Sequence, residues 1–200
     1  MSLRTKVKVG NITNLSDARY CAGMGVDMLG FAISEVEGYG ISAVKFKEIT
    51  DWISGPEFIV ELPEGAVDGM YEKYNVDLIE IPVSKISNLS SLKSKQHYLI
   101  RIDLNDWKQH RKDLLKNSDV INYLITSNLK SLGDLEAKSI VAEMSTDFSV
   151  LLGFEIKVQL LDEYLRWPIA GLALKGSEET SPGIKDYDHL SFILEKLEVD

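Results

Sequence analysis

Short apolar runs of strand length alternate with longer segments of helical period along the chain. This alternation is typical of parallel β-α-β units, in which each strand is followed by a helix that covers the sheet. Eight units in one domain favour a closed (β/α)8 barrel of the TIM type over an open doubly wound sheet, which usually has fewer strands and a glycine-rich turn after the first. The predicted strands are Lys6–Asn11, Met28–Ile33, Glu57–Leu62, Asp77–Pro82, His97–Leu104, Ile121–Thr126, Phe148–Gly153 and Ala170–Lys175.

The segments between these strands carry apolar residues at helical spacing, so each presents one apolar stripe to the barrel. The stripes are Leu15/Ala18/Ala22, Phe46/Ile49/Ile53, Val67/Met70/Tyr71/Tyr74, Val158/Leu161/Leu165 and Leu190/Ile193/Leu194/Leu197. We expect N-caps at Asn14, Ser42 and Asp188, and a helix stop at Gly25. The serine-rich crossover Ser84–Lys95 fits a helix poorly. In Ser131–Ser145, Ile140 to Ala142 fit either a strand or a helix, and we prefer the helix.

Length and composition limit the partners that the chain can have. With 200 residues, 44% of them hydrophobic, we expect a single domain over residues 1–200. The net charge of −9 argues against nucleic acid and anionic membranes as partners. One cysteine, Cys21, and three scattered histidines predict no disulfide, no metal site and no cofactor. No stretch is apolar enough for a signal peptide or a membrane span, so we expect a soluble, cytoplasmic protein.

Strand side chains alternate between two faces, and the outer face of a barrel strand must be apolar because helices cover it. This parity directs three acids and three bases into the barrel, mostly near the carboxyl ends of the strands: Glu61, Glu80, Asp103, Lys8, Arg101 and Lys175. Buried singly, each charge would be costly, so each must be paired, hydrated or held for a ligand. The residue types alone leave two interpretations open, an internal ion-pair network or a polar pocket for a small charged molecule. Trp52, Trp107 and Trp167 are expected to pack between helices and barrel, and Cys21 to be a small buried residue.

Two segments resemble the phosphoribosylanthranilate isomerase family of tryptophan biosynthesis. Residues 7–18, VKVGNITNLSDA, followed by GVDMLGF at 25–31, are similar to the family opening V-K-I-C-G-I-T-N-L-x-D-A with G-A-D-x-x-G-F. Residues 179–186, ETSPGIKD, are similar to the family's closing segment E-T-S-P-G-x-K-D. The resemblance implies the same barrel and, if the chain is an enzyme, an intramolecular isomerase.

The positions of the family's acid and base hold residues that are unable to do its chemistry. The family reaction, an Amadori rearrangement, needs a general base and a general acid. The base is the cysteine of the opening motif, and here that position is Gly10, which has no side chain. The acid is an aspartate at the end of the sixth strand, and the corresponding residue is Thr126, a far weaker acid. Glu80 and Asp103 are the candidate replacements.

The family's phosphate site is partly retained. It uses backbone N–H groups after the seventh and eighth strands, where this chain has Gly153 and then Lys175, Gly176 and Ser177. With Lys8 and Arg101, these are the candidate ligand-binding residues, and the expected partner is a small anionic metabolite. Gly176 and Ser177 fit a simple turn equally well.

Three hypotheses follow. The first, which we favour, is a divergent isomerase-like barrel that has lost the Amadori activity and binds a small phosphorylated or carboxylated molecule at its mouth. The second is a genuine isomerase with relocated acid and base. The third is a non-catalytic protein that binds a protein partner. Because this fold hosts many chemistries, the site must decide among them.

Overall fold

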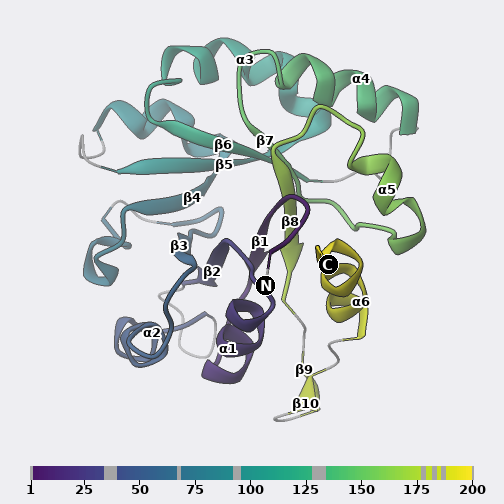
Figure 1. Cartoon of the computed structure of the whole chain (residues 1–200). Helices are drawn as coiled ribbons and strands as arrows, with labels where there is room; N and C mark the ends of the chain where they lie inside the picture. The colour runs from purple at the N-terminus through teal and green to yellow at the C-terminus, as the bar shows by residue number, and fades with distance from the viewer. Residues whose placement is uncertain are drawn as a thin grey trace.

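In the computed structural model of the chain, eight parallel strands form a closed barrel, as the sequence predicted (Figure 1). The structure describes residues 2–33, 40–66, 69–91, 96–127, 134–176, 179–181, 184–185 and 188–199. Strand order follows the sequence, and β8 pairs with β1 to complete the ring. The strands are β1 (Lys6–Gly10), β2 (Met28–Ala32), β3 (Glu57–Glu61), β4 (Leu78–Pro82), β5 (His97–Asp103), β6 (Ile121–Ser127), β7 (Val150–Leu152) and β8 (Gly171–Lys175).

Six α-helices of the described residues surround the barrel, with α3, α4 and α5 along one side in Figure 1 and α1, α2 and α6 along the other. They are α1 (Leu15–Gly23), α2 (Ala43–Thr50), α3 (Trp107–Lys116), α4 (Asp134–Met144), α5 (Leu161–Tyr164) and α6 (Asp188–Leu197). Two of the predicted caps are confirmed, because the side chains of Asn14 and Ser42 accept hydrogen bonds from the backbone N–H groups of Asp17 and Lys45. Asp188 instead forms the first residue of α6, and the ambiguous Ile140–Ala142 segment is helical.

Several crossovers are shorter than ordinary barrel helices. The predicted helix over the Val67 to Tyr74 stripe is wrong for the described residues, since only η1, a 3-10 turn at Glu72–Tyr74, forms before Asn75 takes a left-handed φ of 50° and ends it. The fourth crossover is the 3-10 helix η2 (Val83–Ser91), in line with its weak helical pattern. Short 3-10 turns η3 (Leu104–Asp106) and η4 (Val158–Leu160) precede α3 and α5. The helical layer is therefore thin beside β3 and β4.

A small antiparallel pair outside the barrel was not predicted. Strands β9 (Glu179–Ser181) and β10 (Ile184–Lys185) follow β8 and project from the barrel at the lower edge of Figure 1. They coincide with the segment that resembles the family's closing motif.

Two apolar clusters stabilise the fold. The larger lies between the outer faces of the strands and the helices, and the smaller fills the barrel interior with Met28, Ile59, Leu78, Leu99, Ile125, Leu151 and Ala173. Trp107 and Trp167 are buried and Cys21 is a buried free thiol, as expected. Trp52 is not buried: it is 69% exposed just beyond α2, with the guanidinium of Arg19 5.8 Å from its ring centre.

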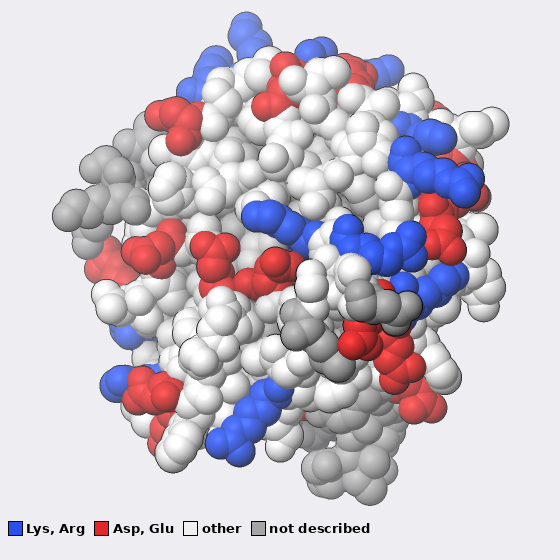
Figure 2. Space-filling view, in the orientation of Figure 1, with Lys and Arg blue, Asp and Glu red and all other residues white. Residues whose placement is uncertain are grey.

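On the surface, acidic and basic side chains are interspersed over the face shown in Figure 2. The net charge of −9 is therefore not gathered there into one continuous acidic patch. Among the described residues, no helix is both long enough and apolar enough to cross a membrane.

Candidate functional site

A lysine is buried inside the barrel between two glutamates. Lys8, on β1, is only 4% exposed at its side chain, and its Nζ forms ion pairs with Glu61 of β3 and with Glu80 of β4, the latter at 2.7 Å. The strand register brings these residues together, since β3 and β4 place Glu61 and Glu80 side by side. The inward direction predicted for all three side chains is thus confirmed.

Arg101 of β5 extends this pair into a network of four charges. Its Nη1 donates to Glu80 Oε1 at 2.6 Å, and its Nη2 donates to the backbone oxygen of Leu62 at 3.2 Å. Both carboxylate oxygens of Glu80 are therefore paired, one with Arg101 and the other with Lys8. Two bases and two acids balance within the barrel, which favours the ion-pair interpretation for these four residues.

The network keeps its buried members charged. Burial opposes the charge of Glu80, but the positive charges of Lys8 and Arg101 outweigh it and hold the pKa of the carboxyl below its ordinary value. Burial also opposes the charge of Lys8, yet Glu61 and Glu80 together raise the pKa of the amine above its ordinary value. Glu80 is therefore ionised at neutral pH and has no proton to donate there.

The second oxygen of Glu61 is held by the backbone. The N–H of Asn11 donates to Glu61 Oε2 at 3.1 Å. Asn11 has a φ of 58°, a left-handed conformation that glycine and asparagine tolerate better than other residues. In the family's opening motif, this position is the glycine after the catalytic cysteine, so the asparagine is compatible with a tight turn at the same place.

Two glycines make room for the Glu61 carboxylate. A Cβ atom added to Gly10 or to Gly30 would overlap Glu61 Oε1 and come within 3.1 Å or less of Lys8 Nζ. Gly10, at the position of the family's catalytic cysteine, therefore has no side chain and also no room for one, because the ion pair between Lys8 and Glu61 fills the adjoining space. Sequence reasoning missed Asn11 and Gly30, although the Gly10–Asn11 dipeptide in place of Cys–Gly was a visible signal.

The position matched to the family's acid does not face the barrel interior. Ile125 belongs to the interior cluster, so its neighbour Thr126 points to the opposite face, where it is fully buried. Its hydroxyl accepts a hydrogen bond from the N–H of Gly153 at 3.3 Å. Of the two candidate replacements, Glu80 is paired on both oxygens, and Asp103 accepts hydrogen bonds from the backbone and side-chain N–H groups of Asn105, each at 2.9 Å.

The predicted ligand-binding residues lie in different settings. Lys8 and Arg101 belong to the network, whereas Lys175 lies exposed at the end of β8, in register with Gly10. The amide of Gly176 donates to the backbone oxygen of Gly10 at 2.7 Å, and that of Gly153 to Thr126. Both amides are thus engaged within the protein, and Ser177 lies outside the described residues.

A cavity of about 320 Å³ opens where β7 and β8 end and α6 begins. Its charged and polar lining comes from Lys175, His189 and Glu155, and its floor is apolar. The ring Nε2 of His189 lies 3.1 Å from the backbone oxygen of Ile156, so the proton of this nitrogen is donated to the carbonyl and Nδ1 is the remaining polar atom of the ring. In barrels of this type, phosphate sites frequently lie after strands seven and eight, beside the start of a helix.

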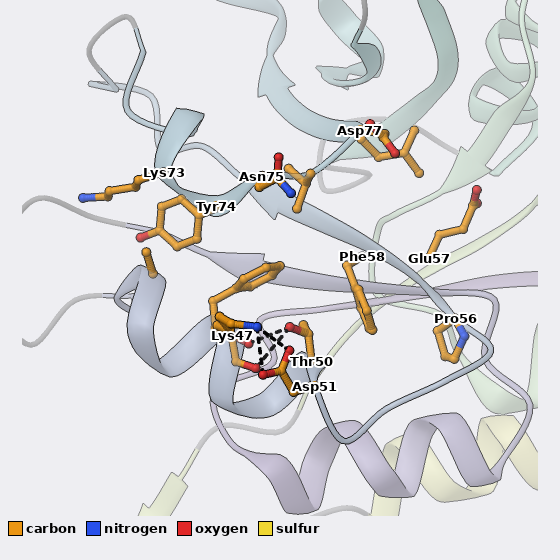
Figure 3. Close-up of a pocket in the computed structure, with 14 residues that line it drawn as sticks. Lys47, Thr50, Asp51, Pro56, Glu57, Phe58, Lys73, Tyr74, Asn75 and Asp77 are labelled. Carbon is orange, nitrogen blue, oxygen red and sulfur yellow. Dashed lines mark hydrogen bonds and ion pairs between the residues drawn. The ribbon is translucent and has the colours of Figure 1, made fainter.

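A larger cavity, of about 520 Å³, lies on the flank of the barrel at the amino ends of β3 and β4 (Figure 3). It exists because η1 covers β3 incompletely and leaves Phe58 half-buried. Lys47 and Asp51 of this wall are hydrogen bonded to each other at 2.8 Å, as the dashed lines in Figure 3 show. None of the residues predicted to bind or react lines this cavity, and the amino face of such barrels serves stability.

Comparison with known proteins shows the same fold. Neither a family profile nor a curated protein matches the sequence. The phosphoribosylanthranilate isomerase of Thermus thermophilus superposes with a TM-score of 0.70 at 18% identity, over 96% of this chain and 98% of that one. The Pyrococcus furiosus enzyme superposes with a TM-score of 0.68 at 15% identity, over the same shares. A thiamine phosphate pyrophosphorylase from Pyrococcus furiosus reaches 0.61 at 12% identity, over 97% of both chains.

Fold and site together define a TIM barrel whose interior holds an ion-paired charge network. Its structure is similar to that of phosphoribosylanthranilate isomerases, at identities that speak for the fold alone. Among the described residues, no three histidine, cysteine, aspartate or glutamate side chains are grouped as metal ligands would be.

Proposed function

We propose that this chain is an isomerase-like barrel that no longer carries out the Amadori rearrangement, and that it binds a small phosphorylated or carboxylated molecule at the carboxyl-terminal mouth. The observation that carries the first half is the position of Glu61, whose carboxylate adjoins Gly10 where the family has its base. The second half rests on the cavity between β7, β8 and α6, which Lys175 lines.

Loss of the family reaction follows from general acid and base chemistry. Gly10 offers no group to take a proton, and Thr126 faces away from the mouth and accepts a hydrogen bond from Gly153. Each proton transfer by a positioned side chain contributes roughly 10²–10⁴-fold to the rate. The two losses together leave a barrel with little isomerase activity.

Anion binding is supported by charge and shape at the ends of β7 and β8. Lys175 supplies a positive charge that suits phosphate or carboxylate, and it is the charged donor among the residues that line this cavity. Because the amides of Gly153 and Gly176 are engaged inside the protein, we assign recognition of the anion to the Lys175 side chain. Glu155 on the rim disfavours highly charged ligands, so a single small anionic group fits best.

The two other hypotheses lack a comparable observation. A relocated acid and base would need Glu80 or Asp103, and Glu80 is paired with Lys8 and Arg101 while Asp103 accepts hydrogen bonds from Asn105. A protein partner would need a contiguous apolar surface, whereas exposed large apolar residues such as Val44, Leu135 and Phe192 lie on different helices or termini.

An activity assay tests the first half of the proposal, the loss of the Amadori rearrangement. Purified protein is mixed with freshly made phosphoribosylanthranilate, and loss of substrate fluorescence is followed beside an authentic isomerase and the variants Glu80→Gln and Asp103→Asn. We expect no turnover above the buffer blank for any form of this chain. Turnover that one of the two variants abolishes would overturn the proposal and assign the chemistry to that carboxylate.

Calorimetric titration with ribose 5-phosphate and with inorganic phosphate tests the second half. We expect Lys175→Gln to weaken binding by about tenfold or more, as for loss of a charge-assisted contact worth about 1.4 kcal/mol. Lys157→Gln is the matched control, because this exposed lysine directly follows the cavity-lining residues after β7 and lies outside the cavity. Equal losses in the two variants, or no binding to the native chain, would refute a specific site at Lys175.

A further inference from the structure

We propose that the ends of β1, β2 and β3 form an anion-binding site that the chain fills with its own Glu61 carboxylate. Removal of that side chain would leave a site for a small free carboxylate such as formate. This site shares no residue with the cavity lined by Lys175 and His189, so the inference does not depend on the proposed anion binding there, although it uses the same position of Glu61 as the proposed loss of isomerase activity.

The donors around Glu61 are arranged as they would be around a bound carboxylate. Lys8 Nζ pairs with one oxygen, and the N–H of Asn11 donates to the other at 3.1 Å. The amine comes from a fully buried position on β1, and the amide is aimed by the left-handed backbone of Asn11. Charged amines and backbone amides in such turns are the groups that bind carboxylates in proteins.

The walls of this site leave room for the carboxylate of Glu61. Gly10 and Gly30 border it, and at either position a Cβ atom would collide with Glu61 Oε1. Truncation of Glu61 to alanine therefore removes one methylene group and a carboxylate from a space that two glycines keep open. Glu61 is also 12% exposed, so the site borders solvent and a small ion can enter it.

The electrostatic balance of the network favours an anion in that space. In the native chain, Lys8 and Arg101 face Glu61 and Glu80, so the charges cancel. Without Glu61, two positive charges face one buried negative charge, and the remaining carboxylate, Glu64, is 4.0 Å from Arg101 and 71% exposed. Lys8 would keep Glu80 at 2.7 Å, so its charge stays paired and the variant retains the means to fold.

The experiment is chemical rescue of Glu61→Ala by sodium formate. Thermal unfolding is measured in formate and in sodium chloride at equal ionic strength, for the native chain, Glu61→Ala, Glu61→Gln and Glu64→Ala. We expect the Tm of Glu61→Ala to rise by about 3 °C or more when formate is at about ten times its dissociation constant. The other three proteins should respond equally to both salts, because glutamine still fills the space and Glu64 lies outside it.

A second measurement tests the proposal if Glu61→Ala is too unstable to fold. If Glu61→Ala does not fold in chloride, its refolding yield from urea is compared in formate and in chloride, and only formate should raise it. Equal behaviour of Glu61→Ala in the two salts, or an equal formate effect in Glu64→Ala, would overturn the proposal. Acetate and acetamide extend the series, since acetate carries the required charge and the uncharged acetamide should have no effect.

Discussion

The carboxylate of Glu61 lies in the space that a side chain on Gly10 would enter. These two residues come from β1 and β3, about fifty positions apart, and the Glu61 carboxylate sterically excludes a side chain at position 10. A cysteine at position 10 and a glutamate at position 61 are therefore alternatives in this barrel. Placing the isomerases' cysteine base at position 10 would require at least two changes.

Gly10→Cys should destabilise the chain because the new side chain overpacks the ion pair. We expect a loss of roughly 1–3 kcal/mol in the free energy of unfolding, measured by urea denaturation. In a Glu61→Ala background, the added loss should fall below about 0.5 kcal/mol, since the colliding carboxylate is gone. Gly23→Ala serves as control, because a Cβ there meets no atom within 4 Å. Strictly additive effects of Gly10→Cys and Glu61→Ala would contradict the steric coupling.

Lys8→Met should be among the most damaging single substitutions. It leaves Glu61 and Glu80 facing each other without the amine that pairs with both, and breaking a buried pair costs about 3–5 kcal/mol. Lys47→Met makes the same change at the exposed Lys47–Asp51 pair, where the cost is about 0–1 kcal/mol. Urea denaturation of the two variants compares them directly. A cost for Lys8→Met no larger than that for Lys47→Met would show that the network adds no stability.

Stability should depend on pH at both extremes. The pKa of Glu80 is lowered from an ordinary value of 4.5, so its contribution is complete above that pH and is lost as pH falls through the lower folded value. The pKa of Lys8 is raised from 10.5, so its contribution is complete below that pH and is lost as pH rises through the higher folded value. The urea concentration at the unfolding midpoint, measured from pH 2 to 11, should fall less steeply at acid pH in Glu80→Gln than in the native chain. If the midpoints of the native chain and of Glu80→Gln fell in parallel with pH, Glu80 would not be the source of the acid dependence.

Asn11 should tolerate glycine better than alanine. Its φ of 58° costs an ordinary side chain roughly 1–2 kcal/mol and costs glycine nothing. We expect Asn11→Gly to change the free energy of unfolding by less than about 0.5 kcal/mol, and Asn11→Ala to lower it by about 1 kcal/mol. The difference between the two Tm values provides the measurement, and a more stable alanine variant would speak against a strained turn at this position.

Strand parity predicted the inward direction of Lys8, Glu61, Glu80 and Arg101, because a barrel strand must turn its apolar side chains toward the helices. Parity cannot say which of these side chains meet, since that depends on the stagger between four strands and on rotamers. In β6, the more apolar alternate set is Ile121, Tyr123 and Ile125, which would have directed Thr126 inward, whereas the structure places Ile125 inside the barrel and Thr126 on the opposite face. Parity fails there because the pairing of β5 with β6 shifts register after Ile121, and such a bulge reverses the faces of the residues that follow it.

The crossover after β3 shows a different limit. Its apolar residues recur at helical spacing, but spacing alone does not set how many turns form. Tyr74 donates its hydroxyl proton to the backbone oxygen of Ile41 at 2.7 Å, and Asn75 then turns left-handed. These tertiary contacts end the segment after η1, and helical period in the sequence carries no information about them.

The three tryptophans differ sharply in their surroundings, and this gives the chain a built-in optical reporter. Trp107 and Trp167 lie in apolar environments, whereas Trp52 is 69% exposed to water. A soluble quencher such as iodide will therefore reach one indole in the native state and all three after unfolding. Because Arg19 lies over the exposed ring, the accessible emission also senses the junction of α1 and α2, independently of events inside the barrel.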